Sequence, residues 1–409
     1  MRLLFNATNI NSEGSVVLLE HLLSGFLAYT FPDGQQISKL LLYHNPEYSK
    51  RLDSLLQTLS AEEQGRLELI PSREPDALRR FIWEQMKLPK LIQEQQVDIL
   101  FSFCSTGPLS PNCRQILYLQ QPIPLTRFRP WRYLWQWLTF QWVYGFLINL
   151  AQMGSERIVV PTQWLVEPLR QSVVYRKPLQ TYRVSLPGIP TLPQPDSVEL
   201  TPKEQNFLQQ VSQWKAEGHK ILLYPCDLSP YKNIPALLDT IRKISDSIPT
   251  FKLILTFNGE TKWFFPCKKE VFAAVSKCPR KQVVLSGRLR RPILAQLYRM
   301  TDAVFYPSLV ESLGLPLLEA MSLGLPIVAL DGGLNHQATV AAFAKEVCQD
   351  AAIYVPPGKS KLLAEKIKHL LHDEGLAATL SQNGLKRASQ LNWVEHIQAI
   401  LSPNMSDLE

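Results

Sequence analysis

One stretch in the second half of the chain decides the expected fold: Tyr306-Pro-Ser-Leu-Val-Glu311-Ser-Leu-Gly314-Leu-Pro316-Leu-Leu-Glu319-Ala-Met-Ser-Leu-Gly324-Leu-Pro326. It predicts a strand that ends at Tyr306, a loop that holds Glu311 and Gly314, and a helix that begins near Leu315. Pro316 suits the first turn of that helix, because its missing N–H would have no partner there. The free N–H groups around Gly314 and the helix dipole then form a site for an anion such as a diphosphate.

The loop and the helix each contribute one acid to this stretch. Glu311 precedes the helix, and Glu319 lies one turn inside it. A carboxylate accepts two hydrogen bonds, so each acid can bind a vicinal diol. A sugar nucleotide carries one diol on ribose and one on its sugar, on either side of a diphosphate. The alternative is that Glu319 only complements the helix dipole and that Glu311 is a solvated loop acid.

Strands and helices alternate outward from this stretch through the whole second half of the chain. The predicted strands are 221–224, 252–257, 282–285, 303–306, 326–330 and 352–355. The predicted helices between and after them include 233–245, 291–300, 315–322 and 359–371. Six β/α units of this kind predict a doubly wound parallel sheet, with ligands bound at the carboxyl ends of its strands.

The first half shows the same alternation less clearly. We expect strands at 3–5, 40–43, 97–103, 115–119, 157–161 and 182–186, with helices at 15–29 and 76–95. A proline-rich stretch at 187–195 is typical of a linker. The sequence therefore predicts an α/β protein with two Rossmann-like domains, 1–190 and 200–390, that face each other across a cleft. A last helix within 391–409 is expected to pack back on the first domain.

Length and composition agree with two globular domains. The chain has 409 residues, with 45% hydrophobic and 19% charged residues, which excludes a disordered protein. A net charge of +7 suits a phosphate-bearing ligand or an anionic lipid surface. The six cysteines form no CxxC pair, so we expect neither a metal site nor a disulfide framework. The first residues turn polar too soon for a signal peptide, which favours a cytoplasmic location.

The quoted stretch resembles the E-x7-E signature of retaining glycosyltransferases with the GT-B fold, family four, also called glycosyl transferases group 1. The resemblance covers residues 220–371 well and the first domain loosely. The positions that match the family pattern are Pro307, Ser308, Glu311, Ser312, Leu313, Gly314, Leu315, Pro316, Glu319, Ala320, Met321, Gly324 and Pro326. The resemblance implies that Glu311 contacts the donor sugar near the reaction centre and that Glu319 binds the ribose hydroxyls.

The same resemblance implies a diphosphate clamp before the helix at 233–245. Lys232 and Asn233 match the lysine of the family's Arg-x4-Lys pair and the residue after it. Asp227 stands where the family has the arginine, and an acid there repels phosphate unless it is paired. Arg288, which follows another strand, is the candidate for the missing charge. The alternative for Lys232 and Arg288 is that both are ordinary surface residues.

Two further donor contacts are implied by position. Gly14 and Ser15 match the glycine loop that closes over the donor diphosphate, and Asn258 with Gly259 matches a turn beside the donor. Many relatives also have a histidine after the strand that corresponds to 97–103, but this chain has none there. His21 and His44 are expected to be structural.

The segment 127–148 is rich in tryptophan and arginine, and residues 133–155 carry no charge. Four tryptophans and several amides argue against a transmembrane helix, because such residues prefer the membrane interface. One hypothesis is peripheral docking on the anionic inner face of a membrane, near a lipid-linked acceptor. The other is a helix buried beneath the first sheet.

The resemblance implies transfer of a sugar from a nucleoside-diphosphate sugar to a glycan or lipid-linked acceptor, with retained anomeric configuration. No D-x-D motif is present, so we expect no metal, and we expect no cofactor and no nucleic-acid partner. In the family the route is front-face, without a protein nucleophile. The alternatives are a sugar-nucleotide epimerase or phosphorylase of the same fold, and a sugar-nucleotide-binding protein without activity, which Asp227 and the missing histidine keep open.

Overall fold

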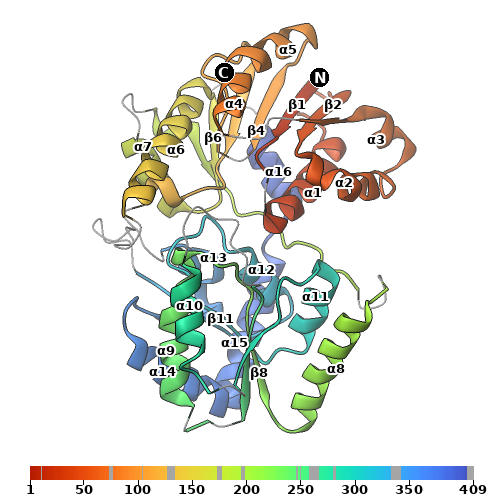
Figure 1. The fold of residues 1–409 in the computed structure, drawn as a ribbon. Coiled ribbons are helices and arrows are strands. Elements are labelled where there is room, and N and C mark those ends of the chain that lie inside the picture. The colour runs from red at the N-terminus through yellow and green to blue at the C-terminus, as the bar shows by residue number, and fades with distance from the viewer. Residues whose placement is uncertain are drawn as a thin grey trace. The chain divides into compact units, whose positions relative to one another are not determined.

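The computed structural model describes residues 1–10, 12–72, 77–103, 105–126, 134–172, 177–194, 199–245, 247–248, 250–257, 267–279, 282–332 and 342–402. The chain divides into two compact units (Figure 1). Unit 1 comprises Met1–Leu125, Thr139–Pro190 and a last segment from Asn392. Unit 2 comprises Thr191–Leu391 and a short segment that ends at Leu138.

Unit 1 is built on a seven-stranded parallel sheet in the order β3-β2-β1-β4-β5-β6-β7. Its strands are β1 (Arg2–Ala7), β2 (Lys39–His44), β3 (Leu67–Pro71), β4 (Ile99–Phe103), β5 (Arg114–Tyr118), β6 (Arg157–Val160) and β7 (Tyr182–Val184). The strand order reverses between β1 and β4, so the connections that follow these two strands diverge there. The sequence predicted six of these strands and missed the edge strand β3.

The helices of this unit are α1 (Glu13–Ala28), α2 (Ser49–Leu56), α3 (Ala61–Arg66), α4 (Ala77–Ile82), α5 (Leu88–Glu94), α7 (Val166–Ser172) and α16 (Trp393–Leu401). Helix α6 (Leu134–Gly154) belongs to this unit from Thr139 onwards. The predicted helix over 76–95 is confirmed, but it is not a regular α-helix throughout. A π-helical segment, Trp83–Lys87, separates α4 from α5. Pro89 has no N–H to bond back to the preceding turn, and this favours a wider turn before it.

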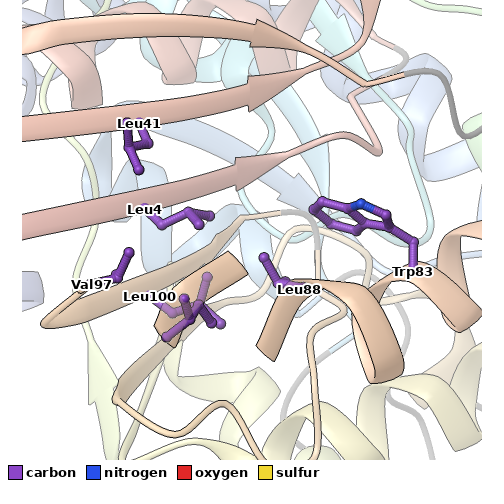
Figure 2. Packing of buried hydrophobic residues seen from close by; sticks show 7 residues of the cluster. Leu4, Leu41, Trp83, Leu88, Val97 and Leu100 are labelled. Carbon is purple, nitrogen blue, oxygen red and sulfur yellow. The ribbon is translucent and has the colours of Figure 1, made fainter. Parts of the chain in front are cut away.

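The π-helical segment directs its first residue into the core. Trp83 and Leu88 pack against Leu4 of β1, Leu41 of β2 and Leu100 of β4 (Figure 2). All five side chains are nearly or fully buried. Burying such side chains stabilises the unit by about 1.5–3 kcal/mol each.

The last helix, α16, packs against α1 although the two are far apart in the sequence. A Cβ atom on Gly25 of α1 would lie 2.6 Å from Ile397, so only glycine allows this contact. Trp393 stacks on His21, with ring centroids 4.6 Å apart, and donates a hydrogen bond from Nε1 to the carbonyl of Ile189. The chain therefore ends its described part within unit 1.

Unit 2 is built on a six-stranded parallel sheet in the order β10-β9-β8-β11-β12-β13. Its strands are β8 (Lys220–Tyr224), β9 (Phe251–Leu255), β10 (Val283–Leu285), β11 (Ala303–Tyr306), β12 (Ile327–Leu330) and β13 (Ala352–Val355). These are the six strands that the sequence predicted. The strand order reverses between β8 and β11, the two strands at the centre of the sheet.

The helices of unit 2 are α8 (Pro202–Ala216), α9 (Ile234–Ile244), α10 (Lys268–Val275), α11 (Arg291–Arg299), α12 (Leu315–Ser322), α13 (Phe343–Cys348), α14 (Ser360–His372) and α15 (Glu374–Ser389). Helices α9, α10 and α14 lie on one side of the sheet, and α8 and α11 lie on the other (Figure 1). Helix α9 illustrates how such a helix packs on the sheet. Its buried apolar residues recur every three or four positions and so lie on one face: Ile234, Leu237, Leu238, Ile241 and Ile244.

Candidate functional site

The reversal point of the unit 2 sheet brings two loops together. One follows β8 and contains Lys232, and the other follows β11 and contains Glu311. The backbone N–H of Leu309 donates to the carbonyl oxygen of Tyr231 over 2.7 Å, which joins the two loops directly. In open α/β sheets, ligands bind at this position, beyond the carboxyl ends of the strands.

Lys232 and Glu311 form an ion pair between these loops. Lys232 Nζ lies 2.5 Å from Glu311 Oε1, and the two side chains are only 11% and 17% exposed. The hydroxyl of Ser308 donates to the same carboxylate oxygen over 2.8 Å. Burial by itself would lower the pKa of Lys232, but the charges of Glu311 and Asp227 outweigh it and raise that pKa well above its ordinary value. The lysine is therefore held as a cation.

The N-cap of α12, Gly314, lies three residues after Glu311. Gly314 caps this helix with φ of +76°, a conformation that glycine adopts without strain. A Cβ atom there would lie 3.0 Å from Leu317 Cδ1 and 3.1 Å from Phe343 Cε2, so space also requires glycine. Within the described part of the chain, no side chain caps this helix end, and Pro316 occupies its first turn. Its free N–H groups and dipole favour an anion.

Asn233 holds the preceding loop in place. It adopts a left-handed conformation, with φ of +55°, and is the residue directly before α9. Asparagine is one of the few side chains that tolerate this conformation. The backbone turn at Asn233 places Lys232 at the end of the loop that precedes α9. The Tyr224 hydroxyl also donates a hydrogen bond to the Lys232 carbonyl oxygen over 2.8 Å. Sequence position alone selected Asn233, but its backbone conformation explains the choice of residue.

Glu319 also forms an ion pair, with a residue that the sequence analysis did not select. Arg291 Nη1 lies 2.5 Å from Glu319 Oε1, and the Glu319 side chain is 3% exposed. Arg291 is the first residue of α11, and Glu319 lies inside α12. In the alternative interpretation, Glu319 only complements the dipole of its own helix. That interpretation does not account for the ion pair with Arg291. No local motif links two residues 28 positions apart, so only the fold reveals the pair.

The other residues of unit 2 that were predicted to bind the donor belong to neither of these two ion pairs. Ser312, Leu313 and Leu315 lie in the loop that leads into α12 or at its first position. Arg288 is exposed in the loop after the edge strand β10, with β9 between it and β8. Its role in balancing Asp227, which is also exposed, stays a prediction. Asn258 and Gly259 lie outside the described residues.

Gly14 and Ser15 lie at the start of α1, and their predicted contact with the donor diphosphate stays a prediction. Helix α1 already begins at Glu13, so both residues lie in its first turn. Ser12 caps the helix, because its side chain accepts a hydrogen bond from the Ser15 backbone N–H over 3.2 Å. A serine at this position satisfies an N–H that would otherwise be free, and it extends the helix towards β1.

Unit 1 has a buried polar cluster at its own reversal point, which the sequence analysis missed. Glu84, in the π-helical segment, accepts hydrogen bonds from Asn6 Nδ2 of β1 over 3.2 Å and from Thr106 Oγ1 over 2.9 Å. Burial raises the pKa of Glu84, although Arg80 and these two bonds act in the other direction. Glu84 therefore links β1 to the loop that follows β4.

The surroundings of His21 and His44 are consistent with the structural roles predicted for them. His44 is 2% exposed, and its Nδ1 lies 3.0 Å from the Asn45 carbonyl oxygen. His21 stacks on Trp393.

The chain was compared with known proteins. Residues 206–387 match the family model "Glycosyl transferases group 1". A putative glycosyltransferase, EpsD of Bacillus subtilis, is 26% identical over 211 residues, which cover 50% of this chain and 51% of EpsD. D-inositol 3-phosphate glycosyltransferase of Jonesia denitrificans is 25% identical over 255 residues, 59% of this chain and 56% of that protein. The matched regions thus span only about half the length of these relatives.

Solved structures share the fold over nearly the whole chain. Anabaena HepE, crystallised in complex with UDP and glucose, superposes with a TM-score of 0.64 at 17% identity, over 97% of each chain. At this identity the likeness establishes the architecture, which is the two-unit α/β arrangement of GT-B proteins. Residues 206–387 are therefore similar to the glycosyl transferases group 1 family, and the whole chain shares the GT-B architecture.

Proposed function

We propose that this protein is a glycosyltransferase that moves a sugar from a nucleoside-diphosphate sugar to a glycan or lipid-linked acceptor, with retained anomeric configuration. One observation carries the proposal. The ion pair between Lys232 and Glu311 lies at the reversal point of the unit 2 sheet, and α12 begins four residues after Glu311 with no side-chain cap from the described residues. This arrangement offers a cation and free N–H groups to a diphosphate, with a carboxylate next to them.

The chemistry follows from charge. When the bond between sugar and diphosphate breaks, negative charge develops on the leaving diphosphate, and preorganised donors stabilise it. Lys232 and the N–H groups at the start of α12 are such donors. A bound diphosphate would compete with Glu311 for Lys232. The Glu311 carboxylate would then be free to accept hydrogen bonds from hydroxyl groups of the donor sugar. No protein nucleophile or metal ion enters this proposal, and the departing phosphate assists the acceptor.

The similar proteins support the donor class. Anabaena HepE was crystallised in complex with UDP and glucose, and the relatives from Bacillus subtilis and Jonesia denitrificans are both named as glycosyltransferases. A nucleoside-diphosphate sugar is the donor that is consistent with these proteins and with the site in unit 2.

The second candidate is a sugar-nucleotide-binding protein without transferase activity. Asp227 favours it, because this exposed acid stands in the loop that carries Lys232 and accepts a hydrogen bond from the Ser229 hydroxyl. A negative charge in that loop weakens the field that a diphosphate experiences. The two candidates differ in turnover, and both require nucleotide binding.

The experiment has two stages. Thermal shift with UDP-, GDP- and ADP-sugars identifies the donor, because a ligand that binds only the folded state raises the melting temperature. Release of nucleoside diphosphate is then measured for the wild type and for Glu311→Ala. We expect release by the wild type and its loss in the variant. Binding without release in the wild type would support the non-catalytic candidate, and the lack of any shift would contradict both.

We also propose that α6 docks on the anionic inner face of a membrane, close to a lipid-linked acceptor. Trp135, Trp142, Phe146 and Met153 of α6 are 82%, 78%, 58% and 44% exposed. They are spaced by seven, four and seven residues, so they form one stripe along the helix. Lys, Arg, Asp and Glu are absent from α6, whereas Arg127, Arg129 and Arg132 precede it in the sequence. Tryptophan and arginine both favour the interface of an anionic bilayer.

This stripe argues against the alternative of a wholly buried helix, since several of its largest side chains are exposed. Among the described residues, no helix is long and apolar enough to cross a membrane. A cytoplasmic location is part of the same proposal, and the free thiols of Cys113, Cys226, Cys267, Cys278 and Cys348 are consistent with it.

A further inference from the structure

The environment of Glu319 differs from that of Glu311. Glu319 is buried inside α12, and its ion-pair partner is Arg291 and not Lys232. Arg291 contacts it through Nη1, at 2.5 Å from Oε1. Arg291 donates its hydrogen bond to Oε1 of the Glu319 carboxylate. A carboxylate has about four acceptor positions, so this contact leaves acceptor capacity on the group.

A second polar group, the Tyr298 hydroxyl of α11, lies beside Glu319. It is fully buried, and its side chain interacts with the Glu319 carboxylate. Burial and then this carboxylate raise the pKa of Tyr298. Arg291, Glu319 and Tyr298 thus form one buried polar cluster around the carboxylate.

Arg291 is also fixed from its other side. Its Nη2 donates to the carbonyl oxygen of Thr191 over 3.3 Å. The guanidinium is therefore held by two contacts, one to a carboxylate and one to backbone, and its planar fork can satisfy both at once. A buried carboxylate needs such a partner, because an unpaired buried charge is strongly unfavourable.

We propose that Arg291 is a positioning residue for ribose recognition: it holds the Glu319 carboxylate charged and oriented so that its free acceptor positions bind the ribose diol of the donor nucleotide. The inference rests on the proposed function, because it takes the nucleotide site to be in unit 2. It goes beyond the family resemblance, which gives Glu319 a role and gives none to Arg291. Arg291 does not contact the reacting bond, so its effect is on nucleotide affinity and selectivity.

The test compares two ligands on the full chain. The nucleoside diphosphate that binds best among UDP, GDP and ADP is titrated by calorimetry, and its 2′,3′-dideoxy counterpart is titrated in parallel. Hydrogen bonds to a charged group are worth enough for the wild type to prefer the ribose form by about tenfold to a hundredfold. We expect Arg291→Met to lose this preference by weakening the ribose form alone. Glu319→Gln should have the same effect.

A matched control lies one residue away. Arg290 forms its own ion pair with Glu204, 2.6 Å apart and on the surface, so Arg290→Met removes the same charge without affecting Glu319. We expect this variant to keep the full preference. Arg291→Lys covers the case in which Arg291→Met does not fold. Lysine cannot contact Glu319 and Thr191 together, so the preference should fall by at least about threefold.

The outcomes separate the two proposals. Equal weakening of both ligands by Arg291→Met, or an unchanged preference in Arg291→Lys, would show that Arg291 only stabilises the fold. A wild type that binds both ligands equally would overturn the role of Arg291 and leave the proposed function intact. A wild type that binds none of the three nucleoside diphosphates would instead contradict the proposed function.

Discussion

Lys232 Nζ lies 2.5 Å from Glu311 Oε1, although the two residues are 79 positions apart in the sequence. The contact exists because β8 and β11 are neighbours at the centre of the unit 2 sheet, with their carboxyl ends on the same edge. Both side chains are mostly buried, so the pair is screened little by solvent. Its two members are the residues on which the proposed reaction depends most.

Lys232→Met should reduce turnover by about a hundredfold to a thousandfold, because it removes one preorganised donor for the leaving diphosphate. The measurement is kcat from nucleoside-diphosphate release. Lys220→Met is the matched control, since Lys220 is an exposed lysine at the opposite end of the same strand, β8. The control should keep wild-type turnover. Equal turnover in the two variants would remove Lys232 from the mechanism.

The ion pair also makes a prediction about stability. Glu311→Ala leaves the buried ammonium of Lys232 without its nearest partner, which should cost about 3 kcal/mol of unfolding free energy. Lys232→Met combined with Glu311→Gln removes both charges and should cost less than the sum of the single changes. Denaturant unfolding of the single and double variants measures this coupling. Additive losses would show that the two charges do not stabilise each other.

Gly314→Ala should destabilise unit 2 more than a change at another left-handed glycine. Alanine at φ of +76° costs about 1–2 kcal/mol, and its Cβ would also press on Leu317 and Phe343. Gly218→Ala is the control, because Gly218 has φ of +83° and no atom within 4 Å of its Cβ position. The difference between the two melting temperatures isolates the packing cost. Similar losses in both variants would mean that the start of α12 adjusts freely.

Membrane docking predicts that α6 binds anionic vesicles through its exposed stripe. Trp142→Glu with Phe146→Glu should weaken co-sedimentation with phosphatidylglycerol vesicles by at least about tenfold, because two large apolar groups no longer enter the interface. Val394→Glu serves as the control, as Val394 is 70% exposed on α16. Binding should also weaken as salt increases. A wild type that stays unbound at low salt would contradict the docking proposal.

His396 predicts how stability depends on pH. Burial lowers the pKa of this side chain to about 3, and it lies between the Tyr118 hydroxyl and the Ser185 hydroxyl. An unfolded chain binds the proton with a pKa of about 6.5, so the unfolded state is favoured as pH falls from about 6.5 towards 3. The expected loss of stability is about 2 kcal/mol between pH 6.5 and 5.

His396→Gln should flatten this dependence, because glutamine does not titrate. The unfolding free energies of the wild type and the variant are compared at pH 7, 6 and 5, so that the other titrating groups cancel. Parallel curves would indicate that His396 already takes up its proton in the folded protein.

Much of the fold could be predicted from the sequence because buried parallel strands are short apolar runs separated by helices. Strand β3 was missed because Glu68 interrupts its apolar residues and the strand lies at an edge, where one side needs no partner. The π-helical segment was also missed. Its hydrogen bonds join residues five positions apart instead of four over a single turn, so the pattern of apolar residues hardly changes.

Some residues of the candidate site could be predicted from the sequence, and others could not. Glu311, Gly314 and Glu319 lie within one short motif, so the sequence identifies them. Arg291 and Glu84 become visible only in the fold, because their partners belong to other elements of the chain. The sequence placed the start of α1 at residue 15, whereas Ser12 caps the helix and it begins at Glu13.

The reversal of strand order between β8 and β11 has a consequence for protein engineering. Every segment from β8 to β10 lies to one side of that point, and every segment from β11 to β13 lies to the other. A chimera that joins two family members between residues 286 and 302 would therefore inherit its lysine from one parent and its facing acid from the other. Such hybrids should function only when the lysine of one parent and the acid of the other lie in the same positions beyond the carboxyl ends of the strands.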